Sequence, residues 1–199
     1  MISPGLNPPL ALARAPLLGQ EAATMPAPLI TPATQADVPA LHSLIESAYR
    51  GDSARTGWTH EADLLGGQRT DAETLSAMIA DSAQRILIAK SGSTPIGCVA
   101  ISDRGAGLAY LGMLTVAPAL QAGGIGRALI AAAEAYARDT LAATHMEMTV
   151  IDQRQDLIAY YERRGYLATG EARPFPYGDE RFGLPRTDAL RFAVLARAL

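Results

Sequence analysis

The stretch from residue 116 to residue 127 constrains the fold more than any other part of the chain. It reads VAPALQAGGIGR and joins a strand-like apolar run ending at Val116 to a helical pattern in which Ile125, Leu129 and Tyr136 share one face. Glycines let a charged group approach the backbone closely. The first amides of a helix have no partner within the helix, and the helix dipole is positive there. A strand, a glycine loop and a helix in this order therefore predict an anion site, usually for phosphate or pyrophosphate.

This glycine loop has simpler and competing interpretations. In the simplest, the glycines only make a tight turn between a strand and a helix. A dinucleotide fold would place Gly-x-Gly-x-x-Gly directly after the first strand, but residue 129 is Leu, and about a hundred residues precede the loop. A nucleoside-triphosphate P-loop needs Gly-Lys-Ser/Thr, which the stretch does not contain.

The rest of the chain predicts a mixed sheet with helices packed on it, because hairpins join the early strands and helices join the later ones. Strands are expected at residues 28–32, 85–91, 96–103, 108–116, 145–152, 166–169 and 190–195, with helices after Thr34, after Thr70, from Ile125 and over residues 156–164. Thr34 with Asp37, and Thr70 with Glu73, have the spacing of capping boxes. Residues 171–188 predict a long loop, which in a compact domain is usually functional or mobile.

Composition limits the class of protein. The chain has 199 residues, of which 49% are hydrophobic and 19% charged, which indicates one globular domain. A net charge of −3 does not fit a nucleic-acid-binding protein. No apolar run approaches the ~18 residues of a membrane span. The single cysteine, Cys98, lies in an apolar run and predicts a small buried side chain, which suits a reducing, cytoplasmic setting.

The first 26 residues differ from the rest. They are rich in Pro and Ala, and Arg14 and Glu21 are their only charged residues. No basic run precedes an uninterrupted apolar stretch, so a secretory signal is not expected. We expect a flexible extension at residues 1–26 and one domain at residues 27–199, with Met25 as an alternative start.

Two motifs resemble those of the GNAT superfamily of acyl-CoA-dependent N-acetyltransferases. Residues 116–126, VAPALQAGGIG, resemble its coenzyme A motif, with Gln121 in the Arg/Gln position. Residues 159–166, AYYERRGY, resemble its Ala-x-x-Tyr-Glu-x-x-Gly-Phe/Tyr signature. The two motifs occur in the family's order and spacing. The resemblance covers roughly residues 28–199 and is strongest over residues 111–166.

The resemblance implies a fold and an activity. The fold is a single α/β domain with a mixed, mostly antiparallel sheet, helices on both faces and a V-shaped splay where the strand at residues 145–152 leaves its neighbour. The activity is direct transfer of acetyl from acetyl-CoA to a primary amine of a small molecule, or to a peptide or protein amine, without an acyl-enzyme. No metal, nucleic acid or membrane is expected, and the chain is expected to be a monomer or homodimer. The alternative is a non-catalytic acyl-CoA sensor of the same fold.

The same resemblance implies which residues bind the cofactor. A bulge is expected in the strand ending at Val116, with backbone groups of residues 114–116 facing the pantetheine arm. Amides of residues 122–127 are expected around the pyrophosphate, with the Gln121 amide and the Arg127 charge added. The cofactor-binding residues on this basis are Leu114, Thr115, Val116, Gln121, Ala122, Gly123, Gly124, Ile125, Gly126 and Arg127.

Tyr161 matches the family's general acid. A phenol has a reference pKa of about 10 and is a proton donor at neutral pH. A bulge amide near Leu114 is the expected donor to the oxyanion. The alternative for Tyr161 is a core aromatic, since it lies at helical spacing from Leu157. Tyr160 lies about 100° round the helix and is expected to pack.

The general base is less constrained by the sequence. Some family members have Glu at the position of Thr149 and Asn at that of Arg154, so this chain departs from enzymes that act on protein N-termini. Glu61 is our first candidate because Trp58 beside it is suited to line a pocket. A solvated surface carboxylate is the plainer interpretation of any single candidate. The alternatives to Glu61 as base are Glu147, Asp63 and His60. Residues 50–69 and 171–188 are expected to shape the acceptor site.

Overall fold

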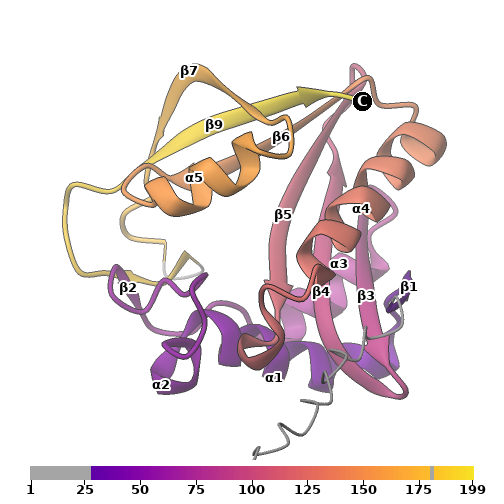
Figure 1. Cartoon of the computed structure of the whole chain (residues 1–199), viewed down its shortest axis with the longest axis horizontal. Helices are drawn as coiled ribbons and strands as arrows, with labels where there is room; N and C mark the ends of the chain where they lie inside the picture. Colours follow the sequence, from indigo (N-terminus) through magenta and orange to yellow (C-terminus); the bar gives the residue numbers. More distant parts are fainter. Residues whose placement is uncertain (1–27, 180–181) are drawn as a thin grey trace, which may run out of the picture.

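The computed structural model describes residues 28–179 and 182–199, in which a seven-stranded sheet carries helices on both faces (Figure 1). The strands are β1 (Leu29–Pro32), β3 (Gln84–Ser91), β4 (Thr94–Asp103), β5 (Leu108–Val116), β6 (His145–Ile151), β7 (Leu167–Pro174) and β9 (Arg191–Ala198). Their order is β1-β3-β4-β5-β6-β9-β7, and β5 with β6 is the parallel pair in this sheet. The mixed, mostly antiparallel sheet is thus confirmed. The extension expected at residues 1–26 lies outside the described residues.

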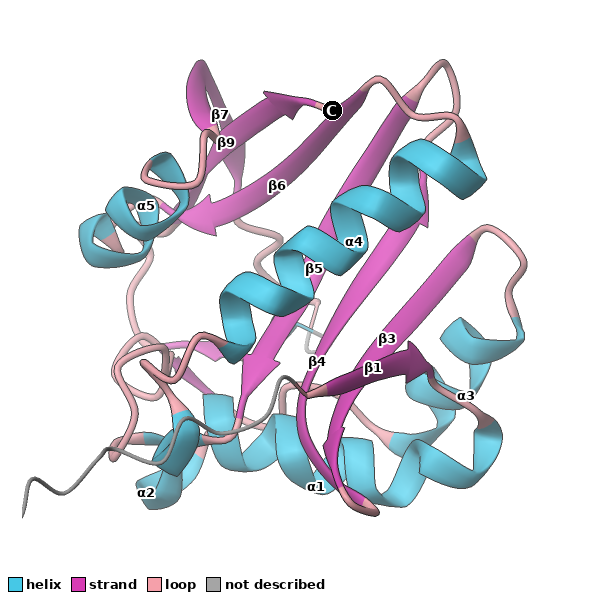
Figure 2. Ribbon diagram, turned by 45° about the vertical axis from the view of Figure 1, so that its right-hand side comes forward, coloured by secondary structure: helices cyan, strands magenta, loops and turns pink. Residues whose placement is uncertain are grey.

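Side chains alternate between two hydrophobic cores on the two faces of the sheet. On β3, Leu87 and Ala89 belong to one core, and Ile86 and Ile88 to the other. Figure 2 shows α4 (Ile125–Leu141) on one face and α1 (Val38–Tyr49) and α3 (Ala72–Ala80) on the other. Two-faced burial explains why the central strands read as nearly continuous apolar runs.

The sheet splays at its centre. β5 and β6 are paired only over Leu108, Ala109 and Tyr110, and the two strands then diverge (Figure 2). On its other side β5 carries a bulge, because Cys98 pairs with Thr115 but Ala100 pairs with Gly112. Met113, inside the bulge, has a left-handed φ of 51°. The predicted bulge and the predicted splay are therefore both present.

The start of α3 corrects one prediction. Its N-cap is Asp71, whose carboxylate accepts the Thr74 amide at 2.6 Å. Thr70 is buried one residue earlier, and its amide donates to Glu46 at 3.0 Å. The predicted capping box of Thr70 and Glu73 was therefore wrong, because the Asp71 carboxylate, one residue later, is the N-cap of α3. The predicted pairing of Thr34 with Asp37 does form, at η1 (Gln35–Asp37).

The loop expected at residues 171–188 is shorter than predicted. β7 runs on to Pro174, with Ala172 paired to Ala193 of β9. β8 (Leu184–Pro185) pairs with β2 (Leu65–Gly66). This pairing joins residues 171–188 to residues 50–69, the two segments that are expected to shape the acceptor site. β7 is exposed along nearly its whole length, so no alternation of apolar residues indicated that it continues past the strand expected at residues 166–169. α5 (Gln155–Glu162) and the short α2 (Gly51–Ala54) complete the helices.

Cys98 is fully buried in the core under α1, as predicted. Burial raises the pKa of its thiol to about 12. Across the residues that the structure describes, no helix combines the length and apolar composition that spanning a bilayer requires.

Candidate active site

A cavity of about 1120 Å³ lies where β5 and β6 diverge. Its walls include the glycine loop, β5, β6, α5, the segment between α2 and α3, and residues of the segment that leads from β7 to β8. The sequence placed these parts far apart along the chain, and the splay brings them around one space. The expected cofactor loop and the expected acceptor segment therefore border the same cavity.

The glycine loop presents the unpaired start of α4 to this cavity. Gly124 precedes the helix with a left-handed φ of 85°, and residues 121–127 all line the cavity. The backbone amides of Ile125, Gly126 and Arg127 donate to no described residue. The positive end of the α4 dipole adds to these donors. The loop is thus built to hold an anionic group such as a pyrophosphate.

Gly126 is needed for close packing as well as for anion access. A Cβ added there would lie 2.8 Å from the Tyr160 hydroxyl. Tyr160 also packs against the Trp58 ring at a centroid distance of 5.2 Å, and the Arg164 guanidinium lies 3.3 Å from the Tyr160 ring centroid. Tyr160 packs as predicted and in addition lines the cavity.

The Gln121 side chain bonds to the acceptor segment. Its Oε1 accepts the Trp58 amide at 2.8 Å, and its Nε2 donates to the Thr59 hydroxyl at 2.8 Å and to the Val116 carbonyl at 3.3 Å. The side-chain amide is therefore used within the protein, whereas the sequence suggested that it faces a phosphate. The place of Gln121 in the cofactor loop then depends on its backbone, and this role stays a prediction.

The bulge on β5 is held by a residue that the sequence did not single out. The Tyr49 hydroxyl donates to the Leu114 carbonyl at 2.8 Å, and burial raises the pKa of Tyr49 to about 12. Leu114 and Val116 line the cavity, whereas the Thr115 side chain is buried and donates to the Met113 carbonyl at 3.0 Å. The side-chain pattern at the end of α1 gave no signal for this contact, because the Tyr49 hydroxyl reaches across 65 residues of sequence.

Tyr161 lies on α5 with its side chain turned into the cavity wall. It is 6% exposed, and its ring meets those of Tyr160 and Tyr166 edge to face. Its hydroxyl has no hydrogen-bond partner among the described residues. Burial, and then the neighbouring tyrosines, raise the pKa of Tyr161 well above 10. The phenol therefore keeps its proton at neutral pH and is available as a donor.

Among the four candidate bases, only Glu61 lines the cavity. Its Oε2 lies 2.9 Å from Nη1 of Arg50, and its side chain is 19% exposed. Glu147 instead accepts two hydrogen bonds from Arg173, at 2.6 and 3.0 Å, outside the cavity lining. Asp63 pairs with Arg55 at the surface, and His60 lies with Asp63 in a smaller hollow of about 190 Å³.

The family follows from a direct comparison. A model of the acetyltransferase (GNAT) family matches residues 40–166, which is more than half of the chain and includes the glycine loop and Tyr161. The chain belongs to the GNAT acetyltransferase family. Membership makes it an acetyltransferase that uses acetyl-CoA, and it accounts for the splayed sheet with a glycine loop at its centre.

Solved structures show the same GNAT fold at low identity. The ribosomal-protein-alanine N-acetyltransferase from Brucella melitensis is 18% identical, with a TM-score of 0.65 over 86% of this chain and 99% of that one. The protein yncA from Salmonella typhimurium, solved with its cofactor acetyl-CoA, is 16% identical, with a TM-score of 0.64 over 86% and 94%. The spermidine/spermine N-acetyltransferase SpeG from Vibrio cholerae is 16% identical, with a TM-score of 0.61 over 85% and 91%. No curated protein sequence matches the chain significantly.

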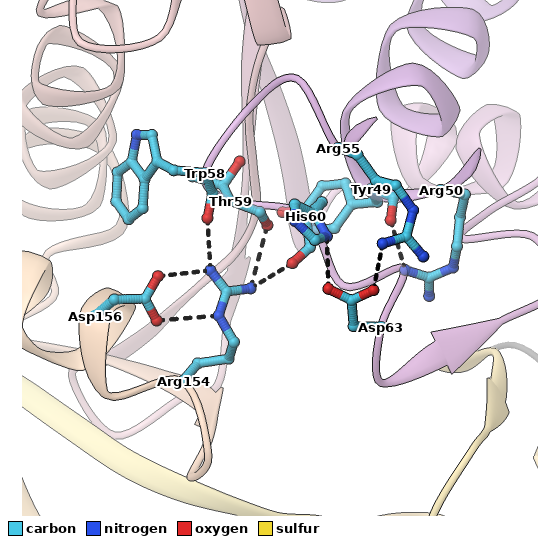
Figure 3. Close-up of polar contacts among 9 residues, drawn as sticks. All are labelled: Tyr49, Arg50, Arg55, Trp58, Thr59, His60, Asp63, Arg154 and Asp156. Carbon is cyan, nitrogen blue, oxygen red and sulfur yellow. Dashed lines mark hydrogen bonds and ion pairs between the residues drawn. The ribbon is translucent and has the colours of Figure 1, made fainter. Parts of the chain in front are cut away.

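Two departures from other GNAT members have structural counterparts. The Thr149 hydroxyl lies 2.6 Å from the Tyr110 hydroxyl, so a neutral pair lines the cavity where some members have a carboxylate. Arg154 precedes α5, pairs with Asp156 and donates to backbone carbonyls of residues 58–60 (Figure 3). The segment opposite α5 is thereby tied to the cavity rim.

Proposed function

We propose that this GNAT acetyltransferase transfers acetyl from acetyl-CoA directly to the primary amine of a small molecule. The observation that carries the proposal is the continuity of the cavity. The glycine loop, Tyr161 and Glu61 all line the same space. An amine held by the acceptor segment and a thioester held beside β5 would therefore meet without an intermediate carrier.

The residues present fit a phosphate-bearing cofactor. The unpaired amides at the start of α4 and the Arg127 and Arg164 side chains line one part of the cavity, and would hold the phosphates. The edge of β5 that is no longer paired with β6, at Leu114 and Val116, would face the pantetheine arm. When bound, acetyl-CoA supplies an activated acetyl thioester, and coenzyme A leaves as a thiol once the acceptor nitrogen has taken the acetyl group.

Two side chains of the chain then carry the protons. Tyr161 holds a proton on its hydroxyl and gives it to the departing sulfur. Glu61 accepts the proton that the acceptor ammonium must lose before its nitrogen can react. The Glu61 carboxylate is held in place by its ion pair with Arg50, at 2.9 Å. Between ammonium and amide the nitrogen loses two protons: one leaves through Glu61 to solvent, and the second replaces the proton that Tyr161 gave to the sulfur, so the reaction releases one proton overall.

The charge of the cavity supports a particular kind of amine. Among the described residues, the carboxylates that line it are Glu61, which pairs with Arg50, and Asp71, which caps α3. Arg69 and Arg104 also line it, and neither forms an ion pair with a described carboxylate. A polyamine needs several free carboxylates, so we expect an acceptor with one cationic centre and a neutral or anionic body. We therefore do not expect spermidine or spermine, the polyamines named for SpeG, to be good acceptors here.

A thiol-release screen tests the proposal. Acetyl-CoA is mixed with the protein and with amino acids, polyamines, aminoglycosides or peptide N-termini, and mass spectrometry identifies the acetylated product. We expect release with a monoamine class and little release with spermidine. Gly124→Glu, which places a carboxylate at the phosphate loop, is the matched inactive control. Absence of release with every acceptor, in protein that binds acetyl-CoA, would favour the non-catalytic sensor instead.

A further inference from the structure

We infer that Arg154 and Gln121 are positioning residues, which hold residues 58–60 from two sides as a wall of the acceptor site. We call these two side chains with residues 58–60 the clamp. The inference rests on the proposed function, because it assumes that the acceptor amine enters beside this segment. The clamp joins α5, which carries Tyr161, to the loop that is expected to bind the cofactor.

Arg154 forms the α5 side of the clamp. Its Nη1 donates to the His60 carbonyl at 2.6 Å, and its Nη2 donates to the Trp58 carbonyl at 2.9 Å (Figure 3). A longer contact, at 3.4 Å, reaches the Thr59 carbonyl. Asp156 fixes the other edge of the guanidinium through contacts of 3.1 Å to Nε and Nη2, and the Arg154 side chain is only 12% exposed.

The planar guanidinium group lets one side chain donate to several backbone carbonyls of residues 58–60 at once. No described backbone amide donates to the carbonyls of Trp58, Thr59 or His60. Arg154 is thus the only described partner of these three acceptors. A lysine ammonium is a point charge with three donors, so it cannot reproduce the planar contacts to two chain segments at once.

Gln121 forms the opposite side of the clamp. It accepts the Trp58 amide and donates to the Thr59 hydroxyl, both at 2.8 Å. Gly57 permits this close approach, because a Cβ there would lie 2.7 Å from Gln121 Oε1. The same residues are therefore held by their amide and hydroxyl groups from the glycine loop, and by their carbonyls from α5.

The clamp has two consequences for the cavity. It sets the Trp58 ring against Tyr160 beside the glycine loop, and Trp58 as a residue is still 39% exposed. It also fixes the start of the chain that leads to Glu61, whose own amide donates to the Tyr49 carbonyl at 3.3 Å. Loss of Arg154 should free residues 58–60 while leaving the amides of the cofactor loop in place.

The single tryptophan makes the clamp directly observable. Trp58 is the only tryptophan of the chain, so fluorescence excited at tryptophan wavelengths reports on this segment alone. In Arg154→Lys and Arg154→Gln we expect a red-shifted emission and about twofold stronger quenching by acrylamide. We also expect the acceptor KM to rise about tenfold, since a small misplacement of a positioning group is costly. The affinity for acetyl-CoA, measured by calorimetry, should change less than twofold.

Arg138→Gln is the matched control. Arg138 is an exposed arginine on α4 that pairs with its neighbour Asp139, and its loss should change neither fluorescence nor KM. Unchanged Trp58 emission, quenching and acceptor KM in a folded Arg154→Lys variant would overturn the inference. The fluorescence arm needs no turnover. Wild-type protein without activity would therefore count against the proposed function, while a Trp58 shift in Arg154→Lys would still support the clamp.

Discussion

Replacing Tyr161 by Phe removes one hydroxyl group and keeps the ring. The ring packs edge to face against Tyr160 and Tyr166, so the aromatic contacts of α5 should survive. The hydroxyl has no described hydrogen-bond partner, so its removal leaves no protein group unpaired. If it protonates the leaving thiolate, its contribution is made in the transition state, and kcat should fall while the affinity for acetyl-CoA holds.

The size of the loss follows from the leaving group. General acid catalysis typically supplies about 10²–10⁴-fold. A thiol has a reference pKa of about 8.5, so the thiolate leaves fairly well unaided. We therefore expect the low end, about a hundredfold in kcat, which corresponds to about 2.7 kcal/mol of transition-state stabilisation. The melting temperature should hold, because the variant keeps the ring packing and loses only a hydroxyl that bonds to no described residue.

Tyr166→Phe is the matched control for this experiment. The Tyr166 hydroxyl donates to Glu134 at 3.0 Å, and the ring is fully buried behind Tyr161. Its removal should lower the free energy of unfolding by about 1–3 kcal/mol, because Glu134 loses a buried donor. Turnover should hold, since Tyr166 does not line the cavity.

Steady-state kinetics on the folded variants distinguish a catalytic role of Tyr161 from a purely structural one. The assay follows thiol release at saturating acetyl-CoA, with single-turnover measurements showing that chemistry limits the rate. Wild-type kcat in Tyr161→Phe under those conditions would remove Tyr161 from the catalytic residues and leave it a core aromatic. A large loss of stability without a loss of kcat would lead to the same conclusion.

Two further predictions concern Glu61 and Cys98. Glu61→Gln should lower kcat/KM at least tenfold at pH 7 and make the loss smaller at high pH, where the amine is already deprotonated; a pH profile parallel to that of wild type would contradict the role of Glu61 as base. Burial raises the pKa of Cys98 from 9.0 to about 12, so the unfolded state releases a proton above pH 9 that the folded state keeps. Stability should therefore be fully present below pH 9 and fall as pH rises toward 12, and the fall, measured by thermal melts, should be weaker in Cys98→Ala. A thiol reagent should also leave Cys98 unmodified until the protein unfolds, and rapid labelling of the native protein would refute the assignment.

The elements that we expect to bind the cofactor could be predicted because each has a local signature. Residues 121–126 combine glycines with the start of a helix, and the two-sided burial of β3 and β4 leaves long apolar runs. The resemblance of residues 116–126 and 159–166 to family motifs then supplied the order of the elements. The splay and the bulge on β5 followed from that resemblance, and neither could be derived from the residues alone.

The contacts that hold the expected acceptor segment could not be predicted because they are long-range. Arg154 stood out only as a departure from family members, and its carbonyl partners lie 94 to 96 residues earlier in the chain. Gln121 was assigned to a phosphate from its place in the glycine loop, and its side-chain partners, Trp58 and Thr59, are too distant in sequence to have been foreseen. The two short strands β2 and β8 carry too few residues for a pattern, and only their pairing reveals them.

Calorimetric titration of acetyl-CoA into the wild-type protein and into Gly126→Glu tests the central claim most directly. The new carboxylate would lie beside the unpaired amides at the start of α4 and would repel the pyrophosphate. Circular dichroism establishes that the variant is folded, and Arg138→Gln serves as the surface control. We predict saturable binding to the wild-type and control proteins and none detectable to Gly126→Glu. Equal affinity in all three folded proteins would contradict the assignment of residues 121–127 as the acetyl-CoA site.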